Sequence, residues 1–174
     1  MNFKDFDYVA SDKFSGKIIL TSFPGLNHEG KFDDTLFLLQ LSLFQNNHCA
    51  SIVSFVEDKE FESLSGKEYF VKRVYQHKIH WHHLPISDLN APNHEFKLKW
   101  ETTKVLLKNE LIEGKNIILH CRGGKGRAGT VAAILLVDFG YNKQEAINLI
   151  REKRKGAIET EKQKNFILSY RATN

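Results

Sequence analysis

The stretch from residue 116 to residue 140 constrains the fold of this chain more than any other. Residues 116–121 (NIILHC) are apolar and predict a buried strand. A glycine-rich loop over residues 122–126 follows, and residues 127–139 predict a helix that ends at Gly140. A strand that passes through a short loop into a helix is expected where strands and helices pack in layers.

The rest of the chain alternates between strands and helices in the same way. Further strands are predicted over three apolar or β-branched runs, at residues 17–23, 50–56 and 79–86. Further helices are predicted over five stretches, at residues 33–44, 57–75, 96–111, from 142 onward and from 160 onward. The dense apolar run at 36–44 is also compatible with a strand. The alternation predicts the α/β fold class, with a central, mostly parallel sheet flanked by helices.

Several of these helices have local signals of their boundaries. Asp33 or Asp34 can cap the first helix. Asn142 and Glu145 have the spacing of a capping box. Gly114 is placed to end the helix predicted at residues 96–111. The helix at 96–111 has one apolar face that we expect to be buried, made of Phe96, Trp100, Thr103, Leu107 and Leu111.

Length and composition favour one folded domain. With 174 residues and 41% hydrophobic content the chain can bury one core, so we expect a single domain over residues 1–174, in which residues 1–16 form a peripheral segment. No apolar run approaches the ~20 residues of a membrane-spanning helix, so we expect no integral membrane segment. The N-terminal stretch MNFKDFDYVASDKF lacks the uninterrupted apolar core of a secretory signal.

Cysteine content and charge bear on the compartment and the partners. The chain has two cysteines, Cys49 and Cys121, too few for a disulfide framework and without metal-ligand spacing. A reducing compartment fits best, so we expect a cytoplasmic protein, although an effector delivered into another cell would have the same features. The net charge of +4 favours anionic partners only weakly, because Lys and Arg are spread along the chain. Nucleic acid is not an expected partner, since no RNA-binding or zinc-finger pattern occurs.

The loop after the strand at 116–121 carries the residues that most clearly indicate chemistry. Cys121 stands at the end of the strand, and Arg127 stands six residues later, at the start of the helix. Loop amides and a helix N-terminus form an anion-binding nest that favours thiolate over thiol, so we expect Cys121 to be ionised near neutrality. The planar fork of Arg127 matches two oxygens of a phosphate group. The predicted phosphate-binding residues are Arg122, Gly123, Gly124, Lys125, Gly126 and Arg127.

Residues 120–127 (HCRGGKGR) resemble the signature His-Cys-x5-Arg of the cysteine-dependent protein tyrosine and dual-specificity phosphatases. From about residue 17 to residue 170 the chain looks most like the kinase-associated phosphatase (cyclin-dependent kinase inhibitor 3-like) group. The supporting segments are TSFPG at Thr21, HHLPISD at His82 and GAIETEKQ at Gly156. The resemblance implies a dual-specificity-phosphatase-like fold and a phosphatase that needs no metal or cofactor. Its substrates would be phosphotyrosine, phosphoserine or phosphothreonine in proteins, hydrolysed through a phosphocysteine intermediate.

The resemblance also assigns roles to residues outside the loop. Asp88 follows a predicted strand, and in the resembling family this loop carries the general acid; the alternative is an Asx-turn before Asn90. Gln163 is similar in placement to the glutamine that positions the hydrolytic water in tyrosine phosphatases. Thr160 and Gln163 also have the spacing of a capping box, and one glutamine can do both. His120 is expected to orient the loop through hydrogen bonds.

One residue departs from the family pattern. The residue after the signature arginine is usually Ser or Thr, and here it is Ala128. Thr130 is not expected to substitute, because two residues along a helix turn the side chain by about 200°. A hydroxyl donor to the leaving thiolate is therefore missing, and we hypothesise that breakdown of the phosphoenzyme limits turnover.

Several alternatives remain open from the sequence. Cys121 is also compatible with a buried core thiol, and the loop with sulfur transfer on a rhodanese-like site. A nucleotide-binding loop would need Gly-Lys followed by Ser or Thr, which does not occur. Arg122 and Lys125 favour a phosphoinositide or other polyanionic substrate, and the loop resembles that of the phosphatase and tensin homologue. Ala128 by itself suggests a phosphoprotein-binding pseudophosphatase. In each phosphate-binding case we expect phosphate or sulfate to bind in the loop.

The remaining histidines and Cys49 have weaker indications. Four histidines invite a zinc interpretation, but no cysteine or carboxylate completes the set nearby, so no metal site is expected; they are His77, His80, His82 and His83. Cys49 is expected in the core. A disulfide between Cys49 and Cys121 that protects the latter stays open.

Overall fold

The computed structural model describes residues 6–172, in which one mixed sheet forms the centre of the molecule. Its strands are β1 (Asp7–Ser11), β2 (Phe14–Thr21), β3 (Cys49–Ser54), β4 (His80–His83) and β5 (Asn116–His120). They lie in the order β1-β2-β5-β3-β4. Only β1 and β2 pair antiparallel, whereas β2 with β5, β5 with β3 and β3 with β4 are parallel. The predicted α/β class with a mostly parallel sheet is confirmed.

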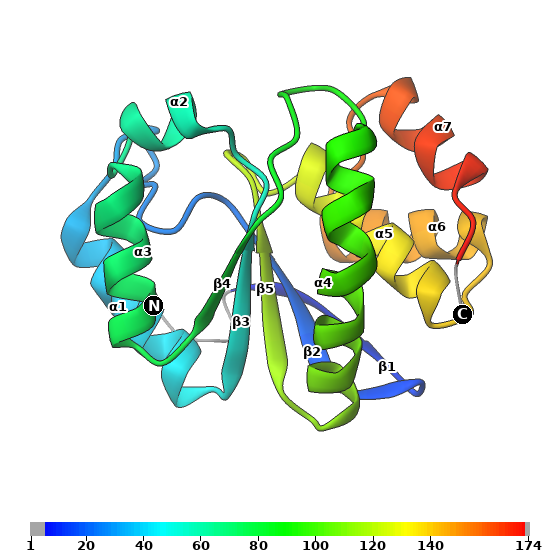
Figure 1. Cartoon of the computed structure of the whole chain (residues 1–174), viewed down its shortest axis with the longest axis horizontal. Helices are drawn as coiled ribbons and strands as arrows, with labels where there is room; N and C mark the ends of the chain where they lie inside the picture. The colour runs from blue at the N-terminus through cyan, green and yellow to red at the C-terminus, as the bar shows by residue number, and fades with distance from the viewer. Residues whose placement is uncertain (1–5, 173–174) are drawn as a thin grey trace.

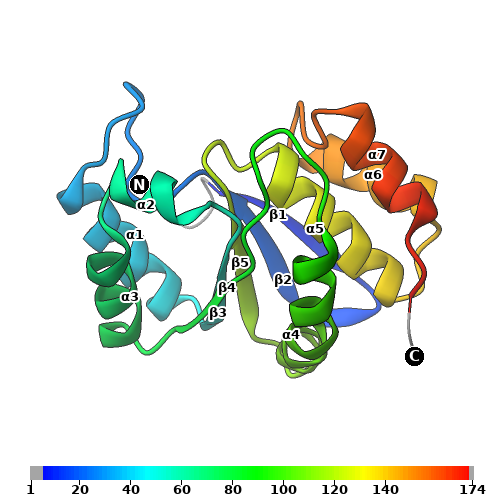
Figure 2. The ribbon, with the colours of Figure 1, turned by 45° about the horizontal axis from the view of Figure 1, so that its top comes forward.

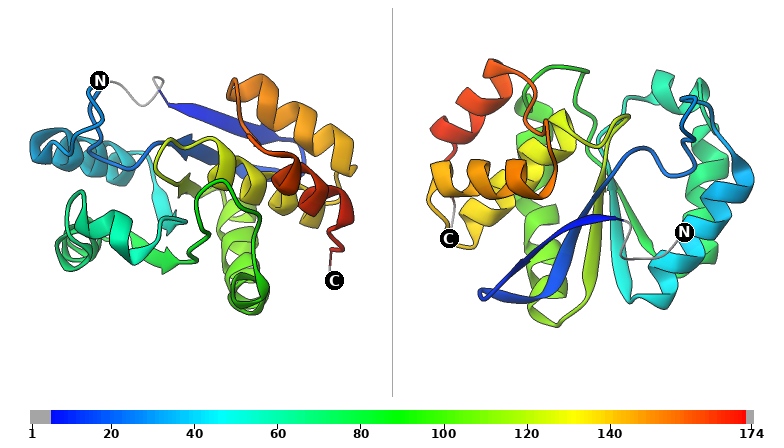
Figure 3. Two further views of the ribbon diagram at one scale, coloured as in Figure 1. Left: turned by 90° about the horizontal axis from the view of Figure 1, so that it is seen from above. Right: turned by 180° about the vertical axis from the view of Figure 1, so that it is seen from behind.

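Helices cover both faces of the sheet, as Figures 1 and 3 show. One face carries α1 (Asp34–Asn46), α2 (Asp58–Glu62) and α3 (Lys67–Gln76). The other face carries α4 (His94–Ile112), α5 (Gly126–Asp138), α6 (Lys143–Lys153) and α7 (Glu161–Ser169). None of the helices within residues 6–172 has the length and apolarity needed to cross a membrane.

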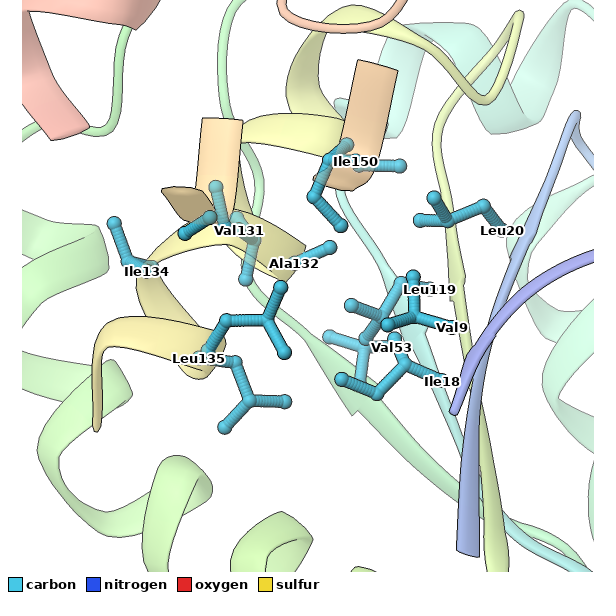
Figure 4. Packing of buried hydrophobic residues seen from close by; sticks show 14 of the residues in the cluster. Val9, Ile18, Leu20, Val53, Leu119, Val131, Ala132, Ile134, Leu135 and Ile150 are labelled. Carbon is cyan, nitrogen blue, oxygen red and sulfur yellow. The ribbon is translucent and has the colours of Figure 1, made fainter. Parts of the chain in front are cut away.

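The two layers arise from the alternation of side chains along the strands. Ile18 and Leu20 of β2 pack with α5 and α6, whereas Ile19 between them packs with α1 and α3. Ile118 follows the same rule on β5, opposite to its neighbours Ile117 and Leu119. Figure 4 shows the first of these cores, in which strand residues meet the apolar side of α5. Because both faces are covered, β2 and β5 carry apolar residues at three consecutive positions, residues 18–20 and 117–119.

Most of the predicted helix boundaries are confirmed. Asp33 is the N-cap of α1, and its side chain accepts a hydrogen bond from the amide of Leu36 at 3.0 Å. The capping box of Asn142 and Glu145 begins α6. The predicted apolar face of α4 is buried, since its members Phe96, Trp100, Thr103, Leu107 and Leu111 are all inaccessible.

Three predictions of secondary structure need correction. The single helix expected over residues 57–75 is two helices, α2 and α3, separated at Gly66, whose φ of 75° no helix accommodates. The strand expected over residues 79–86 is only the four residues of β4. Residues 7–11, placed by the sequence in a peripheral segment, form the edge strand β1. Residues 1–5 of that segment lie outside the described residues.

Candidate active site

The loop of residues 121–125 lies at the carboxyl end of β5, between this strand and the start of α5 (Figure 2). In parallel sheets this edge is where ligands bind, because the following loops and helix N-termini converge there. Cys121 is the first residue of the loop and is 3% exposed. The segments that follow β3 and β4 reach the same edge, since Phe55 and Ile86 both accept a hydrogen bond from Arg127.

The path of the loop depends on one glycine. Gly124 has a φ of 67°, and a Cβ atom added there would lie 2.1 Å from the carbonyl oxygen of Thr21. The amide of Phe23 donates to the carbonyl oxygen of Arg122 at 3.0 Å and holds the loop against the segment after β2. The loop is therefore pressed onto residues 21–23, an approach that only glycine permits.

The amide groups of the loop are available to a ligand. Among residues 6–172, no acceptor pairs with the N–H groups of residues 122–125. Lys125, the N-cap of α5, forms no side-chain capping bond, so the first amides of this 13-residue helix are also uncapped. Unpaired amides at a helix N-terminus make a site for an anion, because the helix dipole adds to their partial positive charge.

Arg127 is fixed by hydrogen bonds from several elements. Its guanidinium is 2% exposed and donates to both carboxylate oxygens of Glu60, over 2.6 and 2.9 Å. It also donates to the carbonyl oxygens of Ile86 at 3.2 Å and Phe55 at 3.5 Å. A buried bidentate pair of this kind sets the orientation of the guanidinium plane before any ligand arrives.

The charges around Arg127 act on its pKa and on that of its partner. Burial by itself would lower the pKa of Arg127, but the bonds to Glu60 and the charges of Cys121 and Asp88 raise it above its usual value. Burial likewise opposes ionisation of Glu60, yet the hydrogen bond from Arg127 holds the pKa of this carboxyl below its usual range. Both groups are thus charged at neutral pH.

Glu60 is a site residue that the sequence analysis missed. Its carboxylate also accepts from the amide of Glu57 at 2.8 Å, in a capping box that begins α2. The spacing of Glu57 and Glu60 was a usable signal for that helix start. The pairing with Arg127, 67 residues away, had no signal in the sequence.

Asp88 lies beside Arg127, at the nitrogen Nη2 that also donates to Glu60. Its Oδ1 is 3.0 Å from Nη2 of Arg127, while 64% of the Asp88 side chain stays exposed. The structure does not show the Asx-turn alternative, because the Asn90 amide that would donate to the Asp88 carboxylate in such a turn donates instead to the carbonyl oxygen of Ser87, at 3.0 Å. The Asp88 carboxyl group is therefore free of the turn and faces the guanidinium.

Gln163 is buried against the other side of the loop. Its Oε1 accepts from the amides of Glu159 at 2.8 Å and Thr160 at 3.2 Å, and its Nε2 donates to the carbonyl oxygen of Asn90 at 3.3 Å. A Cβ added at Gly126 would lie 2.9 Å from Nε2 of Gln163 and 2.3 Å from Oε2 of Glu159. Gln163 thus completes the predicted capping box next to the loop, and Glu159 is a second neighbour that the sequence analysis missed.

His120 links the loop to the sheet. Trp81 Nε1 donates to Ser54 Oγ at 2.9 Å, and Ser54 Oγ lies 2.6 Å from His120 Nε2. With the Ser54 hydroxyl donating to Nε2, Nδ1 carries the proton and faces the carbonyl oxygen of Cys121 at 3.4 Å. Burial lowers the pKa of His120 to about 3, so the ring is neutral and orients rather than transfers protons.

The helix after the loop offers no hydroxyl group to the thiol. Ala128 is buried and has none. Thr130 is buried too, and its hydroxyl donates to the carbonyl oxygen of Gly126 at 2.7 Å, within the same helix. The expectation that Thr130 does not replace the missing Ser or Thr agrees with this geometry.

Several other candidates lie at the rim of the loop or away from it. The side chains of Arg122 and Lys125 are exposed at its rim. Cys49 pairs with Asn116 at the far end of β5 from Cys121, so a disulfide between the two cysteines is excluded in this fold. Burial raises the pKa of the Cys49 thiol, as expected for a core cysteine. No group of three or more metal-ligating side chains gathers within residues 6–172.

Comparisons with known proteins match this geometry. Residues 48–167 match the family described as "Swiss Army Knife protein, DSP-PTPase phosphatase domain". A protein tyrosine phosphatase type IVA 3 of Bos taurus is 40% identical over 68 residues, 38% of this chain and 39% of that protein. A cyclin-dependent kinase inhibitor 3 of Sus scrofa is 36% identical over 101 residues, 56% of this chain and 46% of that protein. The chain thus spans less than half of either relative.

A solved structure extends the similarity to the whole fold. The structure of kinase associated phosphatase, with its catalytic-site cysteine replaced by serine, has a TM-score of 0.76 to this chain. The similarity covers 93% of this chain and 90% of the other, at 22% sequence identity. At this identity the match establishes the shared fold.

Proposed function

Because the chain belongs to the family of DSP-PTPase phosphatase domains, which its residues 48–167 match, we propose that it is a metal-independent, cysteine-dependent phosphatase. It hydrolyses phosphate monoesters on proteins, at phosphotyrosine, phosphoserine or phosphothreonine, through a phosphocysteine intermediate. The observation that carries this proposal is a buried Arg127, oriented by Glu60, next to Cys121 in a loop whose amides are unpaired. Such a site complements a phosphoryl group in transfer.

In the first step the phosphate group is transferred to sulfur. The Cys121 thiolate attacks phosphorus, so that an S–P bond forms and the P–O bond to the leaving group breaks. Asp88 donates its proton to the departing oxygen. Arg127 and the amides of residues 122–127 hold the non-bridging oxygens, in the role proposed for Arg122, Gly123, Gly124, Lys125 and Gly126.

In the second step water releases phosphate. The carboxylate of Asp88 takes a proton from the water that attacks phosphorus, and the P–S bond breaks to restore the thiolate. We assign the positioning of this water to Gln163, which lies against Gly126 at the edge of the loop. Its Oε1 is engaged in capping, so its second Nε2 hydrogen is the group that remains for the water.

A phosphoinositide or other polyanionic substrate is the second candidate. The exposed side chains of Arg122 and Lys125 at the rim of the loop favour it, because cations beside an anion cup attract ligands with further negative groups. Phosphate release from phosphopeptides and from soluble phosphoinositides, measured with the same preparation, separates the two. Higher kcat/KM on phosphopeptides supports the first proposal.

The proposed activity is tested with an aryl phosphate. We expect turnover by the native chain and none by Cys121→Ser, which keeps the shape of the loop but lacks the thiolate nucleophile. Equal turnover by both proteins would overturn the phosphocysteine mechanism. Phosphopeptide binding by the native chain without any turnover would instead indicate the pseudophosphatase that Ala128 suggested.

We also propose a reducing compartment, the cytoplasm, as the place of action. Both cysteines are free thiols, and the mechanism needs Cys121 reduced. Fractionation of the source cells tests this, with activity expected in the cytosolic fraction. Delivery into another cell would instead leave the protein in the medium or in the recipient.

A further inference from the structure

The turn that carries Asp88 rests on the first turn of α7. Three side chains of that helix start donate to it: Thr160 Oγ1 to the carbonyl oxygen of Leu89 at 3.2 Å, Gln163 Nε2 to that of Asn90 at 3.3 Å, and Lys162 Nζ to Asn90 Oδ1 at 3.2 Å. We call residues 87–90 the acid turn. Figure 3 shows the loop between β4 and α4 and the start of α7 at the same end of the molecule.

The acid turn has little apolar packing of its own. All four of its residues are exposed, and Leu89 is 56% exposed. Leu89 also has a φ of 58°, a left-handed conformation that a residue with a branched side chain adopts only when its surroundings hold it there. Two hydrogen bonds that do not involve α7 also hold the turn. The Asn90 amide donates to the carbonyl oxygen of Ser87 at 3.0 Å, and the Ser87 hydroxyl group donates to the carboxylate of Glu57 at 3.2 Å.

Asn90 connects the helix to the peptide of the acid itself. Its Oδ1 accepts from Lys162, and its Nδ2 donates to the carbonyl oxygen of Asp88 at 3.2 Å. Lys162 is thereby connected through Asn90 to the backbone of Asp88. The carboxylate of Asp88 lies 3.0 Å from Nη2 of Arg127. Neither Asn90 nor Lys162 touches the loop of Cys121 in any of these contacts.

We propose that Asn90 and Lys162 are positioning residues that keep Asp88 at Arg127, and thereby set how much general-acid help the leaving group receives. The inference rests on the proposed phosphatase function. Without this link the exposed and strained acid turn moves away from Arg127, while Cys121 and Arg127 keep their places. Attack by sulfur is then intact, and only the protonation of the leaving oxygen suffers.

The dependence on the leaving group distinguishes this role from a general structural one. A strongly acidic phenol leaves without a proton, whereas unsubstituted phenol needs one from the acid. We would measure kcat/KM for 2,4-dinitrophenyl phosphate and for phenyl phosphate, with the native chain, Asn90→Ala and Lys162→Met. Asp88→Asn gives the full loss of the acid for reference.

Two further variants serve as matched controls. Lys164→Met removes the same charge from the same helix, but Lys164 pairs with Glu161 at 4.0 Å and does not contact the acid turn. Lys162→Arg keeps a donor for Asn90 and should restore the native ratio of the two substrates. Thermal unfolding of each variant checks that the fold is retained.

We expect Asn90→Ala and Lys162→Met to lose about tenfold on phenyl phosphate and to stay within about twofold on dinitrophenyl phosphate, as one or two lost hydrogen bonds imply. Lys164→Met should match the native chain on both. Equal losses on both substrates, or no loss where Asp88→Asn shows one, would overturn this inference and leave the phosphatase function standing. Absence of Cys121-dependent turnover in the native chain would overturn both.

Discussion

At the scale of single residues, the site is organised around one buried cation. Arg127 contacts Glu60 through both terminal nitrogens, at 2.6 Å and 2.9 Å, and contacts Asp88 through Nη2 at 3.0 Å. Removing two charges from water costs free energy that their attraction only partly returns, so a buried pair is better evidence for orientation than for stability. Glu60 takes one hydrogen of Nη2 and leaves the other, which Asp88 faces, for an incoming phosphate.

Glu60→Ala should therefore weaken both the fold and the site. It leaves the buried guanidinium with the exposed Asp88 as its remaining carboxylate partner, and breaking a buried pair costs about 3 kcal/mol or more. We expect a lower midpoint of urea unfolding, together with weaker binding of inorganic phosphate measured by calorimetry. Glu62→Ala, at an exposed position of the same helix, is the control and should change neither. Unchanged phosphate affinity in Glu60→Ala would contradict the orienting role.

The lack of a hydroxyl group at Ala128 predicts slow breakdown of the phosphoenzyme in the second step. With no hydroxyl group at position 128 and Thr130 bound to Gly126, no side-chain hydroxyl group in the first turn of α5 donates to the leaving thiolate. A stopped-flow trace should show a burst of the aryl leaving group followed by slower turnover. Ala128→Ser should shrink the burst and raise the steady-state rate by about tenfold, the effect of a charge-assisted hydrogen bond. A native trace without a burst would rule out slow breakdown of the phosphoenzyme.

At the scale of elements, the strand β2 shapes the loop that follows β5. The loop backbone lies so close to Thr21 that no side chain fits at Gly124, whereas a Cβ at Gly123 meets nothing within 4 Å. Of these two adjacent glycines, only Gly124 is required by a close contact. The loop geometry is set by the pairing of the parallel neighbours β2 and β5.

This difference predicts the stability of two matched variants. Gly124→Ala should lower the free energy of unfolding by about 3 kcal/mol, because it adds a clash with the Thr21 carbonyl to an unfavourable positive φ. Gly123→Ala should leave it within about 0.5 kcal/mol of the native value, as a substitution without close neighbours. Denaturant titrations compare the two. Equal effects would mean that the approach to β2 does not fix the loop.

At the scale of the whole molecule, the two helical layers bury a histidine at the carboxyl end of the central strand β5. His120 is fully buried and its pKa is lowered to about 3 from 6.5, chiefly by burial. In the unfolded chain the same ring takes up a proton near its ordinary pKa. The unfolded state therefore binds more protons between these two values, and acid favours unfolding.

His120 should give the molecule an acid-sensitive stability. Its contribution is complete above about pH 6.5 and is lost by about 1.4 kcal/mol per unit as the pH falls toward 3. His120→Asn, which cannot titrate, should show a flatter dependence of unfolding free energy on pH over this range. Chemical denaturation at a series of pH values provides the measurement. Parallel curves for the two proteins would assign the acid sensitivity to other groups.

The sequence by itself determined the features that depend on neighbours in the chain. The unit of β5, loop and α5 was predictable because an apolar strand, glycines and a helix start are contiguous from residue 116 to residue 138. The caps at Asn142 and Thr160 follow from spacings of three residues, whereas the first helix had two neighbouring candidates, Asp33 and Asp34, of which Asp33 is the cap. The signature of Cys121 and Arg127 was predictable for the same reason, because the two residues are only six positions apart in the chain.

Only the tertiary structure decided which distant residues meet at this loop. Glu60 joins Arg127 across 67 residues, and Lys162 joins Asn90 across 72. The edge strand β1 was missed because a strand that exists through its pairing with β2 has little periodicity of its own. Such contacts depend on how the layers close on the sheet, and a pair of side chains brought together in that way leaves no spacing or pattern in the sequence.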